Sequence, residues 1–292
     1  MTAAAFALVI ASAVLHAAWN FLLKRGFNKT AFFWCMCGTS ALLVVPMGVT
    51  VAIIRGLEWK TLGYGVGTMV PHGFYAYTLA RSYSVGDLSS VYPIARGMGP
   101  ALVPLFAVIL LGESVSALAV VGIVMVVAGI YATHIDTRFL RDLSHPLKIL
   151  AAPATQFALL TGVIIAWYTL WDKTSIDADT HPLTVNGFAM AGNFIFLTPF
   201  ALLAVERDIL MREWTTKWRD IIAAGILAPL GYVLVLIALT TSRVSYIAPA
   251  REVGIVLGAA LGVLVLGEGY GMTRIWGSVL IVAGCIVLGV AP

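Results

Sequence analysis

Three ionisable side chains lie deep within apolar stretches of the sequence, namely Arg96, Arg251 and Glu252. A charge at the centre of a bilayer costs at least about 2.5 to 3.5 kcal/mol on insertion scales, so each of them needs a partner or a water-filled cavity. A guanidinium can bind a carboxylate through two parallel hydrogen bonds. The arginines therefore predict a site for a small molecule bearing a carboxylate, or a structural pair in which one of them binds Glu252.

The surroundings of the two arginines support a binding site. Tyr92 precedes Arg96 by four residues and so shares a helix face with it, while Tyr246 precedes Arg251 by five. A proline stands two or three residues before each arginine and removes a backbone hydrogen bond there. Two proline-broken helices with arginines at equivalent points are typical of a transporter site between repeats.

Aromatic and hydrogen-bonding side chains gather in other apolar stretches. His16, Trp19 and Asn20 follow the i, i+3, i+4 spacing that forms one stripe on a helix. His16 could carry a proton, although a histidine in an apolar helix more often makes a structural hydrogen bond. Aromatic walls with a few polar groups suit a small organic ligand. The other candidates for this wall are His72, Tyr75, Trp167, Tyr168 and Tyr232.

The elements that hold these residues are long apolar segments. The chain is 60% hydrophobic and 11% charged, whereas a soluble domain has about 25% charged residues. A membrane helix needs about 20 mostly apolar residues. We therefore expect an all-α membrane protein with ten transmembrane helices. They cover residues 3–23, 31–54, 61–80, 87–110, 115–133, 152–171, 183–204, 220–240, 245–266 and 272–290.

The second half of the chain repeats the first at an offset of 155 residues. Between 96–129 and 251–284, twelve of thirty-four positions are identical, including Leu-Gly-Glu at 111–113 and 266–268. Five spans per repeat is an odd number, so the two repeats must be inverted in the membrane. We predict a first repeat over 1–135, a linker over 136–152 and a second repeat over 153–292. Inverted repeats around a midplane site are a recurrent transporter plan.

The charges give further expectations. The net charge of +4 comes from basic residues scattered over short connections, which indicates lipid head groups as neighbours and no nucleic acid. The connections after odd-numbered spans hold most of the Lys and Arg residues, so the positive-inside rule favours both termini outside. Asp172 with Lys173 is interpreted as the end of the sixth helix, and Glu113 and Glu268 as caps. Because Glu252 is then the only carboxylate within a span, facilitated diffusion is favoured over proton-coupled exchange.

Other functional classes find no support in the sequence. The three cysteines give neither a disulfide framework nor a zinc pattern. Phosphate-binding loops, zinc-protease motifs and nucleophile elbows are absent from the sequence. We therefore expect no enzyme, no catalytic residue, no metal and no cofactor. Glycines spaced seven apart, at 122 and 129 and at 277 and 284, predict a helix packing seam or a dimer contact.

Several short motifs resemble a known family. The sequence HAAWNFLLK at 16–24, its echo AWYTLWDK at 166–173, the two Leu-Gly-Glu motifs and the glycine-rich last helix of each half resemble ten-helix EamA-type permeases of the drug/metabolite transporter superfamily. The resemblance implies a multi-pass protein of the bacterial inner membrane that moves a small molecule, as bacterial amino-acid and metabolite exporters do. Related small multidrug exporters carry a glutamate in their first helix, and this chain has none there.

Together these observations predict an amino-acid exporter or facilitator, with a zwitterionic and in some cases aromatic substrate, that works by alternating access at a midplane cavity. One alternative is an exporter of hydrophobic cations, for which Glu252 is the available carboxylate. A second alternative is a membrane receptor or scaffold that binds without transport. The sequence leaves open whether the protein is a monomer or a homodimer.

Overall fold

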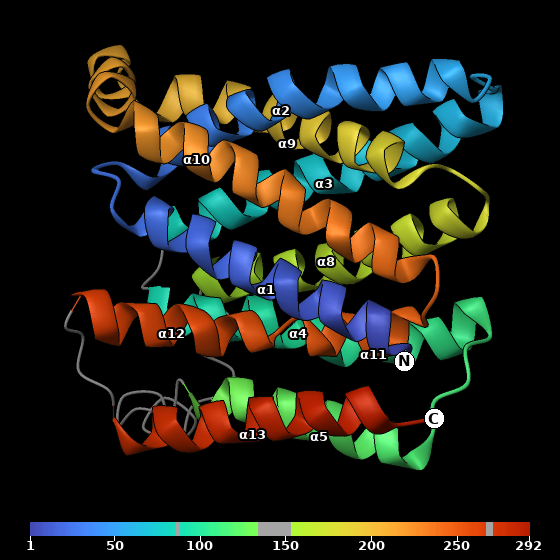
Figure 1. Cartoon of the computed structure of the whole chain (residues 1–292). Coiled ribbons are helices and arrows are strands. Elements are labelled where there is room, and N and C mark those ends of the chain that lie inside the picture. Colours follow the sequence, from blue (N-terminus) through green and yellow to red (C-terminus); the bar gives the residue numbers. More distant parts are fainter. Residues whose placement is uncertain (86–87, 134–152, 267–270) are drawn as a thin grey trace.

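The computed structural model describes residues 1–85, 88–133, 153–266 and 271–292, of which 82–96, 154, 262, 265 and 266 are described by their backbone alone. The first half forms α1 (Ala3–Lys24), α2 (Lys29–Ile54), α3 (Trp59–Val85), α4 (Leu88–Leu111) and α5 (Ala117–Ala132). The second half forms α8 (Pro153–Asp177), α9 (Pro182–Ala204), α10 (Arg207–Leu239), α11 (Val244–Ala250), α12 (Val253–Leu266) and α13 (Met272–Val290) (Figure 1).

Over the described residues these helices confirm the expected all-α membrane fold, and they number ten when α11 and α12 are counted as two parts of one span. Within the described residues, six spans are long and apolar enough to cross a bilayer by length and composition alone, and two shorter apolar helices cover Gly97–Leu111 and Ala117–Ala132. The ninth span is broken between α11 and α12, as predicted from its proline. The fourth is not, since α4 continues through Pro93.

Two helix boundaries differ from the sequence prediction. Helix α8 runs to Asp177, so Asp172 lies inside the helix and does not mark its end. Helix α10 begins at Arg207, and its basic first part was expected to be a connection. At 1.5 Å per residue, its 33 residues extend about 50 Å, more than a roughly 30 Å hydrocarbon layer requires. The first turns of α10 therefore lie beyond the apolar part of the span.

The two halves pack on each other in a symmetric way. Helix α1 packs on α10, and its counterpart α8 packs on α3, the counterpart of α10. Helix α2 packs on α9, and α5 packs on α13, so each of these pairs joins equivalent helices. Inverted five-helix repeats produce this arrangement, in which each of these contacts either has a symmetry-related counterpart or joins two equivalent helices. In Figure 1 the pair α5 and α13 forms one edge of the bundle, α2 and α9 form the opposite edge, and both termini lie at the same end.

The predicted glycine seam joins α5 to α13 within the chain. A Cβ atom on Gly129 would lie 2.7 Å from the carbonyl oxygen of Gly277, and one on Gly284 would lie 2.8 Å from that of Gly122. Only glycine permits such close backbones, which pack tightly where lipid supplies no hydrophobic drive. The four glycines therefore face one another inside this chain and not a second copy.

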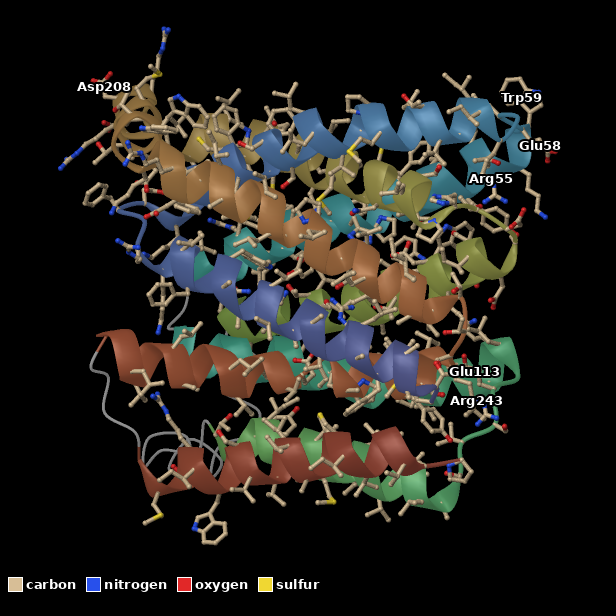
Figure 2. The ribbon with its side chains drawn as sticks, viewed as in Figure 1. Arg55, Glu58, Trp59, Glu113, Asp208 and Arg243 are labelled. Atoms are coloured by element: carbon tan, nitrogen blue, oxygen red, sulfur yellow. The ribbon has the colours of Figure 1, made fainter. Side chains whose placement is uncertain are left out.

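Charged and aromatic side chains mark the two ends of the bundle. Figure 2 shows Asp208 at one end and Arg55, Glu58, Glu113 and Arg243 at the other. The tryptophans that face outward near helix ends are 40 to 88% exposed, as expected at a membrane interface. They are Trp59, Trp214, Trp218 and Trp276. The predicted linker at 136–152 and Glu268 lie outside the described residues, so the repeat boundaries stay a prediction.

Candidate substrate cavity

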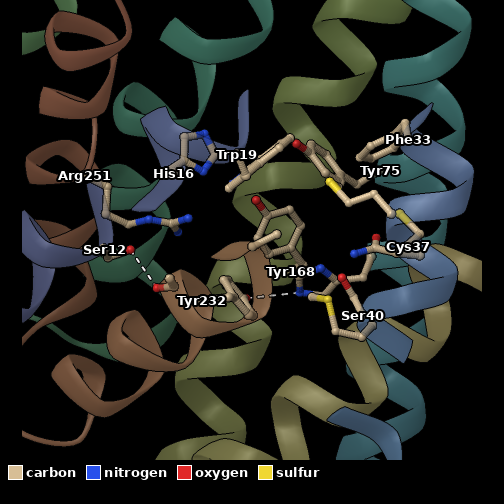
Figure 3. A pocket seen from close by; sticks show the side chains of 16 residues that line it. Ser12, His16, Trp19, Phe33, Cys37, Ser40, Tyr75, Tyr168, Tyr232 and Arg251 are labelled. Atoms are coloured by element: carbon tan, nitrogen blue, oxygen red, sulfur yellow. Dashed lines mark hydrogen bonds between the residues drawn. The ribbon is translucent and has the colours of Figure 1, made fainter. Parts of the chain in front are cut away.

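A cavity of about 80 Å³ lies between the two halves, near the middle of the helices that form it (Figure 3). It is lined by residues of α1, α2, α3, α8, α9 and α10 and by the residue that ends α11. Half of its sixteen lining residues are aromatic or sulfur-containing, and the others include hydroxyl, imidazole, amide and guanidinium groups. Such a surface is typical of a site for a small organic molecule.

Arg251 supplies the positive charge of this cavity. It ends α11 where the ninth span is broken, and the amide of Glu252 bonds to the carbonyl of Pro249, three residues back, in a tight turn. The Arg251 guanidinium carbon lies 5.7 Å from the ring centre of Tyr232, and the side chain points into the cavity (Figure 3). Within the described part of the chain, it forms no ion pair. A cation that lies within the membrane without an ion-pair partner favours an anionic group on a ligand.

A proline in α10 helps to place Tyr232 at the cavity. Pro229 has no N–H group to donate to the carbonyl of Gly225, and the hydroxyl of Ser40 on α2 donates to that carbonyl instead at 2.9 Å. The hydroxyl of Ser12 on α1 donates to the carbonyl of Gly231 at 2.7 Å. These two bonds fix α10 against α1 and α2 on either side of the proline.

Asp172, which the sequence analysis placed at the end of the sixth helix, is an interior carboxylate. Its side chain is fully buried. The Thr68 hydroxyl donates to its Oδ1 at 2.7 Å, and the Tyr232 hydroxyl donates to its Oδ2. Nε2 of His72 lies 3.0 Å from the same Oδ2 and 3.1 Å from the Tyr232 hydroxyl. Helix α8 continues beyond the expected end of the sixth span and includes Asp172. Glu252 is therefore not the only carboxylate within the spans, contrary to the sequence prediction.

Two other carboxylates hold the backbone of helix ends. Glu113 accepts hydrogen bonds from the amides of Val244 and Ser245 at 2.8 and 3.0 Å and from the Ser245 hydroxyl, which caps α11 as predicted. Glu213, 1% exposed, accepts from the amides of Phe27 and Asn28 at 3.1 and 2.9 Å. Both bind amides at the start of a helix, where an acceptor is needed.

Most of the predicted site residues meet at the cavity. It is lined by His16, Trp19, His72, Tyr75, Tyr168, Tyr232 and Arg251. His16 packs edge-on against Trp19, with ring centres 4.9 Å apart. His72 and Tyr168 lie with ring centres 4.1 Å apart. Five different helices contribute these seven side chains, counting Arg251 with α11.

Other predicted residues lie elsewhere. Trp167 is 47% exposed on the outer face of α8, because the cavity face belongs to its neighbour Tyr168. The amide of Asn20 donates to the carbonyl of His16 within α1. The Tyr246 hydroxyl donates to the carbonyl of Pro292 at the end of the bundle, away from the cavity.

Glu252 lies beside the main cavity. It lines a smaller adjoining space, which Tyr168 and Arg251 also border. The side chains of Tyr92 and Arg96 lie outside the described residues, so their predicted roles are untested.

The sequence reasoning missed nine further lining residues, most of them on helices that it had not assigned to the site. They are Ser12, Phe33, Met36, Cys37, Ser40, Met190, Asn193, Ala228 and Gly231. The available signal was spacing, since Phe33, Met36, Cys37 and Ser40 follow one face of α2. No gathering of three or more His, Cys, Asp or Glu side chains suited to a metal ion occurs in the described ranges.

Comparison with known proteins agrees with this architecture. Residues 153–290 match the model of the EamA-like transporter family. The second half of the chain is an EamA-like transporter domain. This match agrees with the resemblance to the drug/metabolite transporter superfamily, and with the apolar helices it indicates a multi-pass membrane protein related to small-molecule transporters. Members of the EamA family are transporters, not enzymes.

Structural comparison extends the likeness to the whole chain. A crystal structure of a protein 18% identical in sequence superimposes with a TM-score of 0.71, over 98% of this chain and 96% of the other. At this identity the match concerns the fold alone. No curated protein matches the sequence.

Proposed function

We propose that this EamA-like protein transports an amino acid or a similar small zwitterion across the bacterial inner membrane by alternating access. The observation that carries the proposal is Arg251, whose guanidinium points into a cavity between the two halves and forms no ion pair among the described residues. A substrate carboxylate would occupy its free hydrogen-bond donors. The break between α11 and α12, next to Arg251, would serve as a hinge about which the two halves move.

The rest of the cavity supports a zwitterion. Asn193 is 8% exposed, lines the cavity, and has an amide oxygen with no hydrogen-bond partner in the described structure. Such an acceptor favours a ligand with a donor group, such as an ammonium. The cavity volume of about 80 Å³ holds on the order of six water-sized groups at about 10 to 15 Å³ each. The cavity at this volume therefore suits a small amino acid. A substrate with a larger side chain requires the surrounding helices to move apart.

The test is counterflow in liposomes. Purified protein is reconstituted into vesicles loaded with one unlabelled amino acid, and entry of the same labelled amino acid is measured for a panel of small, polar and aromatic substrates. We expect flux for some of them, with a loss of at least tenfold in Arg251→Ala. The matched control is Arg55→Ala, which removes an exposed arginine paired with Asp179 at the end of the bundle. Equal flux in wild type and Arg251→Ala contradicts the carboxylate site.

A second candidate is export of a hydrophobic cation, favoured by the buried carboxylate of Asp172 beside aromatic side chains. In that case Arg251 opposes the substrate charge, so Arg251→Ala should keep or raise cation flux. A non-transporting receptor would instead bind a ligand and give no flux at all. The same vesicles, tested with labelled organic cations, separate these outcomes.

A further inference from the structure

We propose that His72 and Asp172 form a proton-binding pair at the cavity wall, and that a proton on this pair is exchanged for the substrate. The inference rests on the proposed function, because it names the ion whose gradient drives transport through the same cavity. It replaces the facilitated diffusion favoured by the sequence, whose premise was that Asp172 lies outside a span.

The geometry fixes the state of the Nε2 atom. Asp172 Oδ2 lies 3.0 Å from Nε2 of His72 and also accepts a hydrogen bond from Tyr232. A bare Nε2 lone pair would face the lone pairs of the carboxylate, so Nε2 carries a hydrogen and donates it. Thr68 donates to the other oxygen at 2.7 Å. Asp172 is thereby held as an anion with three donors and orients the imidazole.

The second ring nitrogen is free to take up a proton. The hydrogen bonds of His72 run through Nε2, and its other described contacts are those of its ring with Tyr168 and Tyr232. Nδ1 has no hydrogen-bond partner among the described residues, and His72 lines the cavity. A proton arriving from the cavity binds the Nδ1 lone pair and turns the pair from a net charge of −1 into a neutral imidazolium–carboxylate pair.

The ionisable groups around the pair come from the helices packed on α8. They are Tyr232 on α10, Tyr168 on α8, Tyr75 on α3 and Arg251 at the end of α11. Lys173 is directed elsewhere, to Asp177 and to the carbonyl of Leu239. Helix α9 and residues 97–111 of α4 carry no ionisable side chain. His72 is therefore the group of this cluster that has a ring nitrogen lone pair to take up a proton.

Exchange follows from competition for one lone pair. A neutral Nδ1 can accept a hydrogen bond from the substrate ammonium, whose charge the net negative pair also attracts. A protonated Nδ1 can do neither. Proton and substrate ammonium thus exclude each other at His72, while Arg251 holds the carboxylate. A gradient of protons into the cell would then drive the substrate outward.

The first experiment uses the unmodified protein. Purified protein in weakly buffered detergent solution is mixed with a substrate found by counterflow, and a pH dye records proton release. We expect close to one proton released per bound substrate at acidic pH and almost none at alkaline pH. In vesicles, a pH gradient with the acid side opposite the labelled substrate should drive its accumulation. The apparent KM should rise as the pH is lowered, by up to about tenfold per pH unit.

Variants separate a proton site from a structural role. In His72→Gln, the flux that remains should no longer respond to pH or to a pH gradient. His181→Asn changes a histidine that caps α9 at the end of the bundle, outside the cavity, and should keep the gradient response. Wild-type counterflow without proton release or gradient-driven accumulation overturns the exchange and leaves the proposed function standing. Gradient-driven accumulation in His72→Gln also overturns it, whereas absence of any wild-type flux refutes the proposed function itself.

Discussion

Asp172 and Glu113 are both carboxylates held by three hydrogen bonds, but they lie in different regions and have different partners. Glu113, at the end of the bundle, accepts from two backbone amides and a serine hydroxyl. Asp172, in the interior, accepts from Thr68 and Tyr232 and faces the imidazole of His72. An amide cannot take up a proton near neutral pH, whereas an imidazole can. The partner, more than burial, therefore distinguishes a structural carboxylate from one that belongs to a proton-binding pair.

The strongest test of this difference is the isosteric pair of variants Asp172→Asn and Glu113→Gln. Asp172→Asn removes the anion that stabilises protonated His72, so we expect proton-driven accumulation to fall by at least a hundredfold. Glu113→Gln keeps an acceptor for the start of α11 and should retain most of the accumulation. Both are measured in vesicles per amount of folded protein. Similar accumulation in the two variants would remove the distinction between the two regions.

Truncating the structural carboxylate should instead affect stability. Glu113→Ala leaves the amides of Val244 and Ser245 and one hydroxyl without their acceptor, at a cost of about 3 kcal/mol. We expect a lower thermal unfolding midpoint in detergent, read by loss of the monodisperse peak after heating. Glu113→Gln serves as the partial replacement with a smaller shift. An unchanged midpoint in Glu113→Ala would show that these bonds contribute little.

The glycine seam between α5 and α13 extends the comparison to a region without polar chemistry. Gly129→Ala places a methyl group 2.7 Å from the carbonyl oxygen of Gly277, and we expect a loss of about 1 to 3 kcal/mol. Gly63→Ala is the control, since nothing lies within 4 Å of its added Cβ. Alanine there should be neutral or slightly stabilising. Thermal midpoints of both variants are compared, and equal midpoints would contradict the close packing of the seam.

The smallest expected effect concerns His181, at the end of the bundle. Burial, followed by the nearby Arg55 charge, lowers the pKa of His181, although Asp179 opposes this shift. Its Nδ1 accepts from the amide of Leu183 and caps α9, which requires the unprotonated form. The unfolded chain binds the proton more readily, so this contribution is present above the unfolded pKa near 6.5 and is lost as the pH falls below it.

His181→Asn keeps a capping side chain but does not titrate. We therefore expect the loss of thermal stability between pH 7.5 and pH 5 to be slightly smaller in His181→Asn than in wild type. An identical loss in both would assign the pH dependence to other groups.

The spans were predictable because they depend on composition, and their inversion was predictable because each repeat has an odd number of spans. Apolar runs of about 20 residues fix the number of helices, and an odd number per repeat fixes the inversion. The break after Pro249 was also predictable, because proline removes a backbone hydrogen bond. The continuity of α4 through Pro93 was not, since a proline alone does not determine whether a helix breaks.

The site was predictable only in part, because one residue of register decides which side chain faces inward. Tyr168 lines the cavity and its neighbour Trp167 is half exposed, although both had been predicted to line it. Asp172 follows Tyr168 by four residues and so shares its face, a spacing that would have indicated its role. The adjacent Lys173 made this point resemble a helix end. The contribution of α2 depends on its packing against α9 and α10, which sequence spacing does not determine.

The central claim is that Arg251 binds a substrate carboxylate, and paired ligands test it most directly. Calorimetric titration of purified protein would compare a transported amino acid with its amide, which keeps the ammonium and side chain but lacks the carboxylate. We predict that the amino acid binds at least tenfold more tightly than the amide, and that Arg251→Ala removes this preference. Equal affinity for amino acid and amide in the wild type would contradict the account.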